Sequence, residues 1–292
     1  MIADGSKMVI DKDQPGQPHQ GKVFVAVHAH LDDVPYFAGG LCAKLMKEGY
    51  TGYIVRTCND EKYGGGTIAE NILSNEQEHL KMAAVLGFKD VFDLYYRSRR
   101  MNEISPVEIR GRLTFILRAL KADTVISFDP SAGGEKDGDH EETGRAVEDA
   151  CAMCGSGNDF AEHLEAGFPA HPVGERYYFW TRPDQRFNRV VDISRYIEKK
   201  IDAIVECKSQ GGGARGSELR GRLAKQGRRL PLLGADDQIA NRAYVRQFLL
   251  DDYREYGKQH NLQFAERFYY VDERPRTPSK VDQYVEKNSV RI

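Results

Sequence analysis

The stretch VFVAVHAHLDD, residues 23–33, decides the fold of this chain. Its first five residues are apolar with no charge between them, the pattern of a β-strand that is covered on both faces. Two histidines and two carboxylates follow directly. In an open α/β sheet, ligands bind just beyond the carboxyl ends of the strands. We therefore expect these polar residues to form a site at such an edge.

The polar end of this stretch has the chemistry of a metal site. His30 and Asp33 offer a nitrogen and an oxygen ligand, the pairing expected for a catalytic divalent metal. Asp32 is the neighbour of Asp33 in the sequence, so its side chain points elsewhere and is free to act as a base on metal-bound water. Burying such a cluster for packing alone would cost too much desolvation. We interpret the stretch as a metal site.

Strand-like and helix-like runs alternate along the chain. We expect strands at 22–28, 52–57, 90–95 and 123–128, and helices at 34–48, 67–86, 105–121 and 141–153. This βαβαβαβα order predicts an α/β fold with a doubly wound, mainly parallel sheet. Extra C-terminal elements are expected as strands near 175–180, 188–193 and 266–271 and helices at 194–209 and 236–259.

A second polar cluster, Asp137-Gly-Asp-His140, follows the strand at 123–128. Two loops that leave the same edge of a parallel sheet can converge on one metal. His30, Asp33 and His140 would then be three ligands with a fourth position open for water, the arrangement of catalytic rather than structural zinc. The metal would lower the pKa of that water to about 7, and Asp32 would take its proton.

These residues resemble the LmbE-like/PIG-L family of zinc-dependent de-N-acetylases. His30-Leu-Asp-Asp33 is similar to the family's HPDD motif, and Asp139-His140 followed by Gly144–Val147 is similar to its DH…GRAV element. Further similar segments are Ala38–Gly40, Glu78 with Leu86-Gly87, Val190–Ser194, and Lys208–Gln210. The resemblance covers roughly residues 20–210.

The resemblance implies a Rossmann-like fold and a hydrolase that removes an N-acetyl or similar N-acyl group from an N-acetylated sugar or glycoconjugate. It implies Zn²⁺, or another divalent metal, as the cofactor. His30, Asp33 and His140 match the family's metal ligands, and Asp32 matches its general base.

Asp137 departs from the family pattern. A histidine often stands three residues before the last ligand, where it stabilises the tetrahedral oxyanion, and this chain has Asp137 there. A carboxylate would repel an oxyanion. Either another donor acts on the oxyanion, or Asp137 has a different catalytic role, such as orienting a ligand or binding a substrate hydroxyl or amine.

Three basic residues are candidates for substrate binding. Arg97 and Arg99 follow a predicted strand, so they are expected to hold an anionic or polyhydroxy substrate, with a solvated loop as the alternative. His171 lies in a proline-flanked loop, and together with the arginines it is a candidate for the missing oxyanion donor.

Other interpretations stay open. His28 alternates with His30, and H-x-H is itself a metal pattern; it resembles both metallo-β-lactamase-like hydrolases and amidohydrolase barrels. Metallo-β-lactamase-like hydrolases have a histidine where this chain has Asp33. Amidohydrolase barrels need more βα units than this chain offers. A different metallohydrolase, acting on an amide or a phosphoester, and a non-catalytic sugar- or nucleotide-binding relative are the remaining function classes.

Composition bounds the location and the partners. With a net charge of -2, the 292-residue chain gives no case for nucleic acid, and no apolar run approaches the ~20 residues of a membrane helix. The N-terminus has no apolar signal region, and five cysteines indicate free thiols. We expect a cytoplasmic protein that acts on a small molecule, with a homo-oligomer left open.

We expect three segments along the chain. Residues 1–20 are a flexible tail and residues 21–210 the catalytic α/β domain. Residues 211–292 hold a Gly/Arg loop, over 211–229, followed by a helix and a strand that pack on the same domain. The loop is expected to be mobile, because its three consecutive glycines cost entropy when they are ordered.

Overall fold

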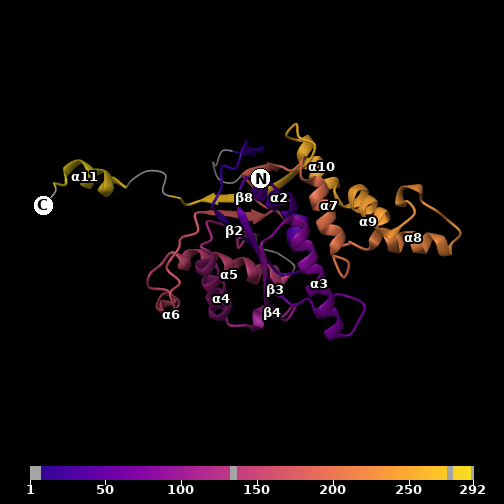
Figure 1. Ribbon diagram of the computed structural model, residues 1–292, viewed down its shortest axis with the longest axis horizontal. Helices are drawn as coiled ribbons and strands as arrows, with labels where there is room; N and C mark the ends of the chain where they lie inside the picture. The colour runs from indigo at the N-terminus through magenta and orange to yellow at the C-terminus, as the bar shows by residue number, and fades with distance from the viewer. Residues whose placement is uncertain (1–7, 132–136, 275–278, 291–292) are drawn as a thin grey trace.

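The computed structural model describes residues 8–131, 137–274 and 279–290, and it is built around one eight-stranded sheet (Figure 1). The strands are β1 (Val9–Asp11), β2 (Val23–His28), β3 (Thr51–Cys58), β4 (Asp90–Tyr96), β5 (Thr124–Phe128), β6 (Glu175–Phe179), β7 (Arg189–Asp192) and β8 (Ala265–Asp272). They are arranged in the order β1-β7-β8-β6-β5-β2-β3-β4.

Most neighbouring strands of the sheet run parallel, as predicted. From β6 through β5, β2 and β3 to β4 every pairing is parallel, and so is that of β1 with β7. Only β8, among the described strands, pairs antiparallel with its neighbours β6 and β7. The α/β class with a mainly parallel sheet is thus confirmed, with one C-terminal strand inserted in the opposite sense.

Helices cover both faces of this sheet (Figure 1). The longer ones are α2 (Gly39–Lys47), α3 (Ile68–Leu86), α4 (Pro106–Leu120), α5 (Gly138–Cys154), α7 (Ile197–Glu206), α8 (Arg215–Lys225), α9 (Asp237–Tyr244) and α10 (Asp251–Lys258). Shorter or terminal ones are α1 (Asp33–Phe37), η1 (Met101–Glu103), α6 (Ala161–Glu165), η2 (Pro231–Leu233), the π-helical turn η3 (Val245–Leu249) and α11 (Lys280–Asn288). The helices α2, α3 and α7 pack together on one side, and α4 and α5 pack together on the other.

Local sequence signals explain where several helices begin and end. Thr67 and Glu70 form a reciprocal capping box at the start of α3, and Gly87, with φ of 99°, ends that helix in the left-handed conformation. Pro106 occupies the first turn of α4. The strands β2 and β5 are buried along almost their whole length, as their apolar sequences predict.

The helix predicted at 34–48 is instead two helices, α1 and α2, that meet at Ala38. A buried ion pair occupies the break: Lys200 donates to the carbonyls of Pro35 and Tyr36, and Glu266 accepts from the amides at the start of α2. The backbone groups that the break leaves without helical partners are therefore satisfied by two residues distant in sequence.

Three further expectations are wrong. Within the predicted tail, Val9–Asp11 form the strand β1. This strand pairs in parallel with the outer side of β7, so that side of β7 has hydrogen-bonding partners. Residues 1–7 lie outside the described residues. The predicted loop at 211–229 contains α8, which begins after the three consecutive glycines and includes Gly216 and Gly221. The predicted helix at 236–259 is interrupted by the π-helical turn η3.

A candidate metal centre and its pocket

Two neighbouring parallel strands deliver the candidate ligands. His30 and Asp33 follow β2 directly, whereas His140 lies in the first turn of α5, beyond β5. Because β2 and β5 pair in parallel, their carboxyl ends lie side by side and the two clusters meet. The helix α5 begins at Gly138, before the predicted start at 141, so His140 is held by a helix rather than by a loop.

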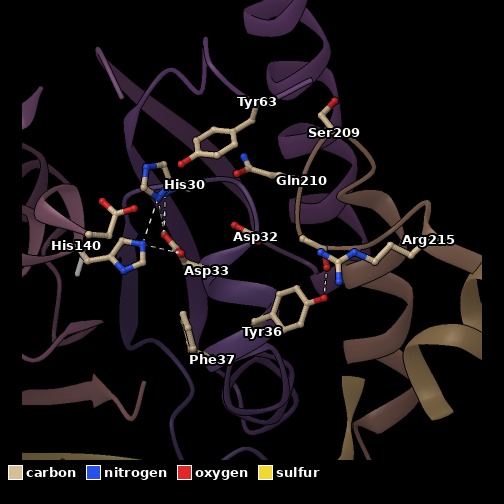
Figure 2. Close-up of a pocket in the computed structure, with 12 residues that line it drawn as sticks. His30, Asp32, Asp33, Tyr36, Phe37, Tyr63, His140, Ser209, Gln210 and Arg215 are labelled. Atoms are coloured by element: carbon tan, nitrogen blue, oxygen red, sulfur yellow. Dashed lines mark hydrogen bonds and ion pairs between the residues drawn. The ribbon is translucent and has the colours of Figure 1, made fainter. Parts of the chain in front are cut away.

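The three predicted metal ligands face one another (Figure 2). His30 Nδ1 lies 3.2 Å from His140 Nε2, and His140 Nε2 lies 3.3 Å from Asp33 Oδ1. Asp33 Oδ2 is 4.0 Å from His30 Nδ1. Imidazole nitrogens and carboxylate oxygens are the ligand types of a catalytic divalent ion, and the two contacts of Asp33 are made by different oxygens. A carboxylate oxygen of Asp137 also lies within 4.8 Å of ligand atoms of both histidines.

Surrounding groups hold these ligands in place. Asp33 Oδ2 accepts hydrogen bonds from the amides of Ala29, at 3.0 Å, and His30, at 2.7 Å. Asp139 Oδ2 lies 3.2 Å from His30 Nε2, so the far nitrogen of the ring is bound to a carboxylate, which fixes the ring's orientation and tautomer. Asp139 is itself held by the amides of Arg99 and Met101. This role of Asp139 was not predicted, although the residue belongs to the quoted DH element.

The adjacent carboxylates Asp32 and Asp33 differ sharply in acidity. Burial raises the pKa of Asp32, and the charge of Asp33 raises it further, to about 7. Burial also raises the pKa of Asp33, but the neighbouring His140 and His30 outweigh burial and hold it well below its usual range. The pair is therefore separated into a carboxylate with a lowered pKa, Asp33, and one that titrates near neutral pH, Asp32, where a general base works best.

These residues line a cavity of about 470 Å³. Its walls are formed by His30, Asp32, Asp33, Tyr36, Phe37, Tyr63, Asp137, His140, Ser209, Gln210, Gly211 and Arg215. The roles of Tyr36, Tyr63 and Arg215 were not predicted from the sequence. Ser209 and Gln210 belong to a segment that entered the family resemblance, whereas Arg215 lay in the stretch interpreted as a loop.

The turn at 209–211 closes one side of the cavity. The carboxylate of Glu78 on α3 accepts from the amides of Lys208 and Ser209. The hydroxyl of Tyr36 donates to the carbonyl of Gly211. A Cβ atom at Gly211 would lie 2.5 Å from that of Asp32, and φ there is +70°, so glycine is required for the turn to approach the Asp32 carboxylate.

The other predicted site residues take different positions. Asp137 caps α5, accepting from the amide of Asp139 at 3.0 Å, and it also faces the cavity. Arg97 bonds Glu61 at 3.3 Å and lies outside the cavity wall. Arg99 reaches the site indirectly, through its backbone amide, which donates to Asp139. Both arginines therefore border the site without lining it.

His171 and His28 are not in the cavity. His171 lies 3.6 Å from Asp123, which precedes β5 and is thus at the opposite edge of the sheet. Its predicted part in substrate binding is wrong, because the loop after α6 folds back towards the amino ends of the strands. His28 is fully buried with its Nε2 3.1 Å from Nε2 of His79, so its ring faces the interior of the domain.

This fold and site define an α/β protein with a candidate metal centre beyond the carboxyl ends of its parallel strands. Residues 25–151 match the family model described as PIG-L, GlcNAc-PI de-N-acetylase. Over these residues the chain matches the PIG-L/LmbE-like family, in agreement with the resemblance seen in the sequence.

Named relatives are deacetylases for the most part. The chain is 26% identical over 190 residues to the probable N-acetyl-alpha-D-glucosaminyl L-malate deacetylase 2 of Bacillus anthracis, covering 63% of this chain and 79% of that protein. The N,N'-diacetylchitobiose deacetylase of Pyrococcus horikoshii superposes with a TM-score of 0.68 at 23% identity, over 92% of this chain and 91% of that one.

One structural neighbour has a different activity. The 4-carboxy-2-hydroxymuconate hydratase of Pseudomonas putida superposes with a TM-score of 0.63 at 18% identity, covering 89% of this chain and 99% of that one. The fold alone therefore does not assign the reaction, which must be argued from the site.

Proposed function

We propose that this protein is a metal-dependent hydrolase that removes an N-acetyl or similar N-acyl group from a substrate containing an amino sugar. The observation that carries the proposal is the convergence of His30, Asp33 and His140, with Asp32 beside them, in one cavity. The deacetylases among the named relatives support the amide as the bond that is cleaved.

We propose zinc as the metal, held by His30, Asp33 and His140. Nitrogen and carboxylate ligands with room for a water molecule are typical of catalytic zinc. Bound zinc would lower the pKa of a water molecule and polarise the acetyl carbonyl. Asp139 supports this assignment, because a carboxylate behind a ligating imidazole is the usual partner of a metal-bound histidine.

In this proposal Asp32 moves the proton. It accepts a proton from the attacking water as the new C–O bond forms at the acetyl carbon. It then returns that proton to the sugar nitrogen as the C–N bond breaks, which releases acetate and a free amine. A pKa raised to about 7 by burial and by Asp33 suits both steps.

Tyr63 is our candidate for the donor to the carbonyl oxygen. Asp137 caps α5 and, as a carboxylate, can only accept hydrogen bonds when ionised. The ring of Tyr63 packs edge-on against His30, with centroids 5.5 Å apart, and its hydroxyl lies on the cavity side, next to Arg99. A phenol at this place can donate to the developing negative charge.

The deciding experiment is a screen of N-acetylated sugars for released acetate. The metal-loaded protein should release acetate from at least one N-acetylglucosamine derivative, lose activity with a chelator and regain it with zinc. Turnover that survives chelation, or no acetate from any sugar, would overturn the proposal. Two ions per chain would favour a different metallohydrolase, and tight sugar binding without metal would favour a non-catalytic relative.

The location and assembly of the protein stay predictions. In the part of the chain that the structure describes, no helix has the length and apolar character needed to cross a bilayer. All five cysteines are free and buried, which supports our proposal of a reducing, cytoplasmic environment. A homo-oligomer remains open.

A further inference from the structure

Phe37 differs in chemistry from the rest of the cavity wall. Among the described residues that line the cavity, it alone carries a side chain without a polar atom. Phe37 is the last residue of α1 and follows Asp33 by four positions, so the two side chains lie one helical turn apart on the same face. The proposed chemistry assigns roles to polar residues of the wall and gives none to this ring.

Two further phenylalanines support the ring from behind. The ring centroid of Phe37 lies 5.7 Å from that of Phe179 and 6.4 Å from that of Phe128, and both of these side chains are buried. The ring of Phe128 in turn stacks on the imidazole of His140, with centroids 4.2 Å apart. Phe37 is therefore separated from a proposed metal ligand by a single ring. Because the core behind it is closely packed, Phe37 forms a fixed wall.

The surroundings of the ligands assign a direction to each substituent of the amide carbon. In Figure 2, Tyr63 and Phe37 lie on opposite sides of the three proposed ligands, and Asp32 lies on a third side. In the proposed reaction the carbonyl oxygen faces Tyr63, and the nitrogen, which carries the sugar, faces Asp32 and receives its proton. The remaining substituent is the acyl chain, which therefore points towards Phe37.

We propose that Phe37 closes the acyl pocket and restricts the substrate to short N-acyl groups, with acetyl preferred; this inference rests on the proposed function. The methyl group of an acetyl gains apolar contact with the ring. A longer chain meets a wall that cannot move back without straining the packing of Phe128 and Phe179. Phe37 is then a specificity residue that selects the length of the acyl group.

The test compares N-acetyl-, N-propionyl- and N-butyrylglucosamine, which share one sugar and differ only in acyl length, by the free amine that is released. We expect the wild type to prefer the acetyl compound. In Phe37→Ala, the ratio of kcat/KM for the butyryl compound to that for the acetyl compound should rise roughly 10- to 200-fold, the discrimination that a methylene group produces in an apolar pocket.

Two variants accompany Phe37→Ala. Phe115→Ala removes a phenylalanine of α4 that is 38% exposed and does not line the cavity, so it should leave the ratio unchanged. Phe37→Leu keeps an apolar but smaller side chain and should raise the ratio by an intermediate factor. If Phe37→Ala does not fold, Phe37→Leu decides in its place.

A second measurement needs no turnover. Acetohydroxamate and butyrohydroxamate share a head group that binds zinc and differ only in the length of the chain. In calorimetry with the zinc-loaded protein, the wild type should bind acetohydroxamate more tightly, and Phe37→Ala should bind butyrohydroxamate more tightly.

The outcomes separate this inference from the proposed function. A wild type that cleaves the butyryl compound as well as the acetyl one, or a ratio unchanged in Phe37→Ala, overturns the inference and leaves the deacylase intact. If the wild type releases amine from none of the three compounds, the proposed function fails for these sugars and the hydroxamates decide about Phe37. Reversal of their order in Phe37→Ala then supports the acyl wall, and an unchanged order or no binding refutes it.

Discussion

The substitution Glu266→Ala should lower the free energy of unfolding by about 5–7 kcal/mol. The carboxylate of Glu266 is fully buried and accepts three hydrogen bonds: from Lys200 Nζ at 2.7 Å and from the amides of Gly40 and Leu41 at 2.9 and 2.8 Å. Burial lowers the pKa of Lys200, and the charge of Glu266 opposes that effect. Glu266 therefore neutralises a buried cation and caps α2 at the same time.

The magnitude follows from these contacts. Removing one partner of a buried ion pair costs about 3–5 kcal/mol, because the other charge is left uncompensated. Each of the two amides that loses its acceptor adds about 1 kcal/mol, although the contributions are not strictly additive. A domain of this kind is stable by only about 5–15 kcal/mol, so the variant should unfold at much lower denaturant.

Urea unfolding at equilibrium measures this loss. Glu286→Ala, an exposed glutamate on α11, is the matched control and should change stability by less than about 0.5 kcal/mol. Adding Lys200→Met to Glu266→Ala should recover part of the loss, because the orphaned charge is removed. If Glu266→Ala itself does not fold, Glu266→Gln serves in its place. A loss below about 1 kcal/mol, or no recovery in the double variant, would refute the reasoning.

Three predictions concern the site. His140→Ala should lose the bound metal while remaining folded, and elemental analysis showing equal, stoichiometric metal in the variant and the wild type would remove His140 from the ligand set. Asp32→Asn should keep the metal and lose about 10²–10⁴-fold in kcat. Because only the ionised base accepts a proton, the wild-type rate should fall as the pH falls below the Asp32 pKa of about 7. Bound metal would shift this fall in rate to lower pH. Tyr63→Phe should keep the metal and lower kcat about 10²-fold with little change in KM, so unchanged kinetics would exclude the hydroxyl as a donor.

The centre of the fold and of the site could be predicted because its signals are local. An uninterrupted apolar run before His30 means a strand covered on both faces, and such strands belong to parallel sheets. The direction of a parallel strand then places the following polar residues at the ligand edge. The same argument applied to β5 brought His140 to Asp33 across the sheet. The resemblance to a known family added the roles of these residues.

Residues that depend on contacts between distant segments could not be predicted. His171 has the chemistry of a site residue, but its loop returns to the opposite edge of the sheet. Arg215 follows glycines that resemble a mobile loop, yet Gly211 is held against Asp32 by Tyr36. Nothing in the local pattern around either residue encodes these contacts.

The sequence by itself determined the α/β class with its mainly parallel sheet, the edge at which ligands gather and the ligand set proposed for the metal. Apolar periodicity and the side-chain chemistry at strand ends are properties of short segments, so they can be recognised before folding is known. Only the tertiary structure decided the break between α1 and α2, the support of His30 by Asp139 and the placement of Arg215 across the cavity. These depend on pairs such as Lys200 and Glu266, whose interaction exists only after the chain has brought distant residues together and excluded water from between them.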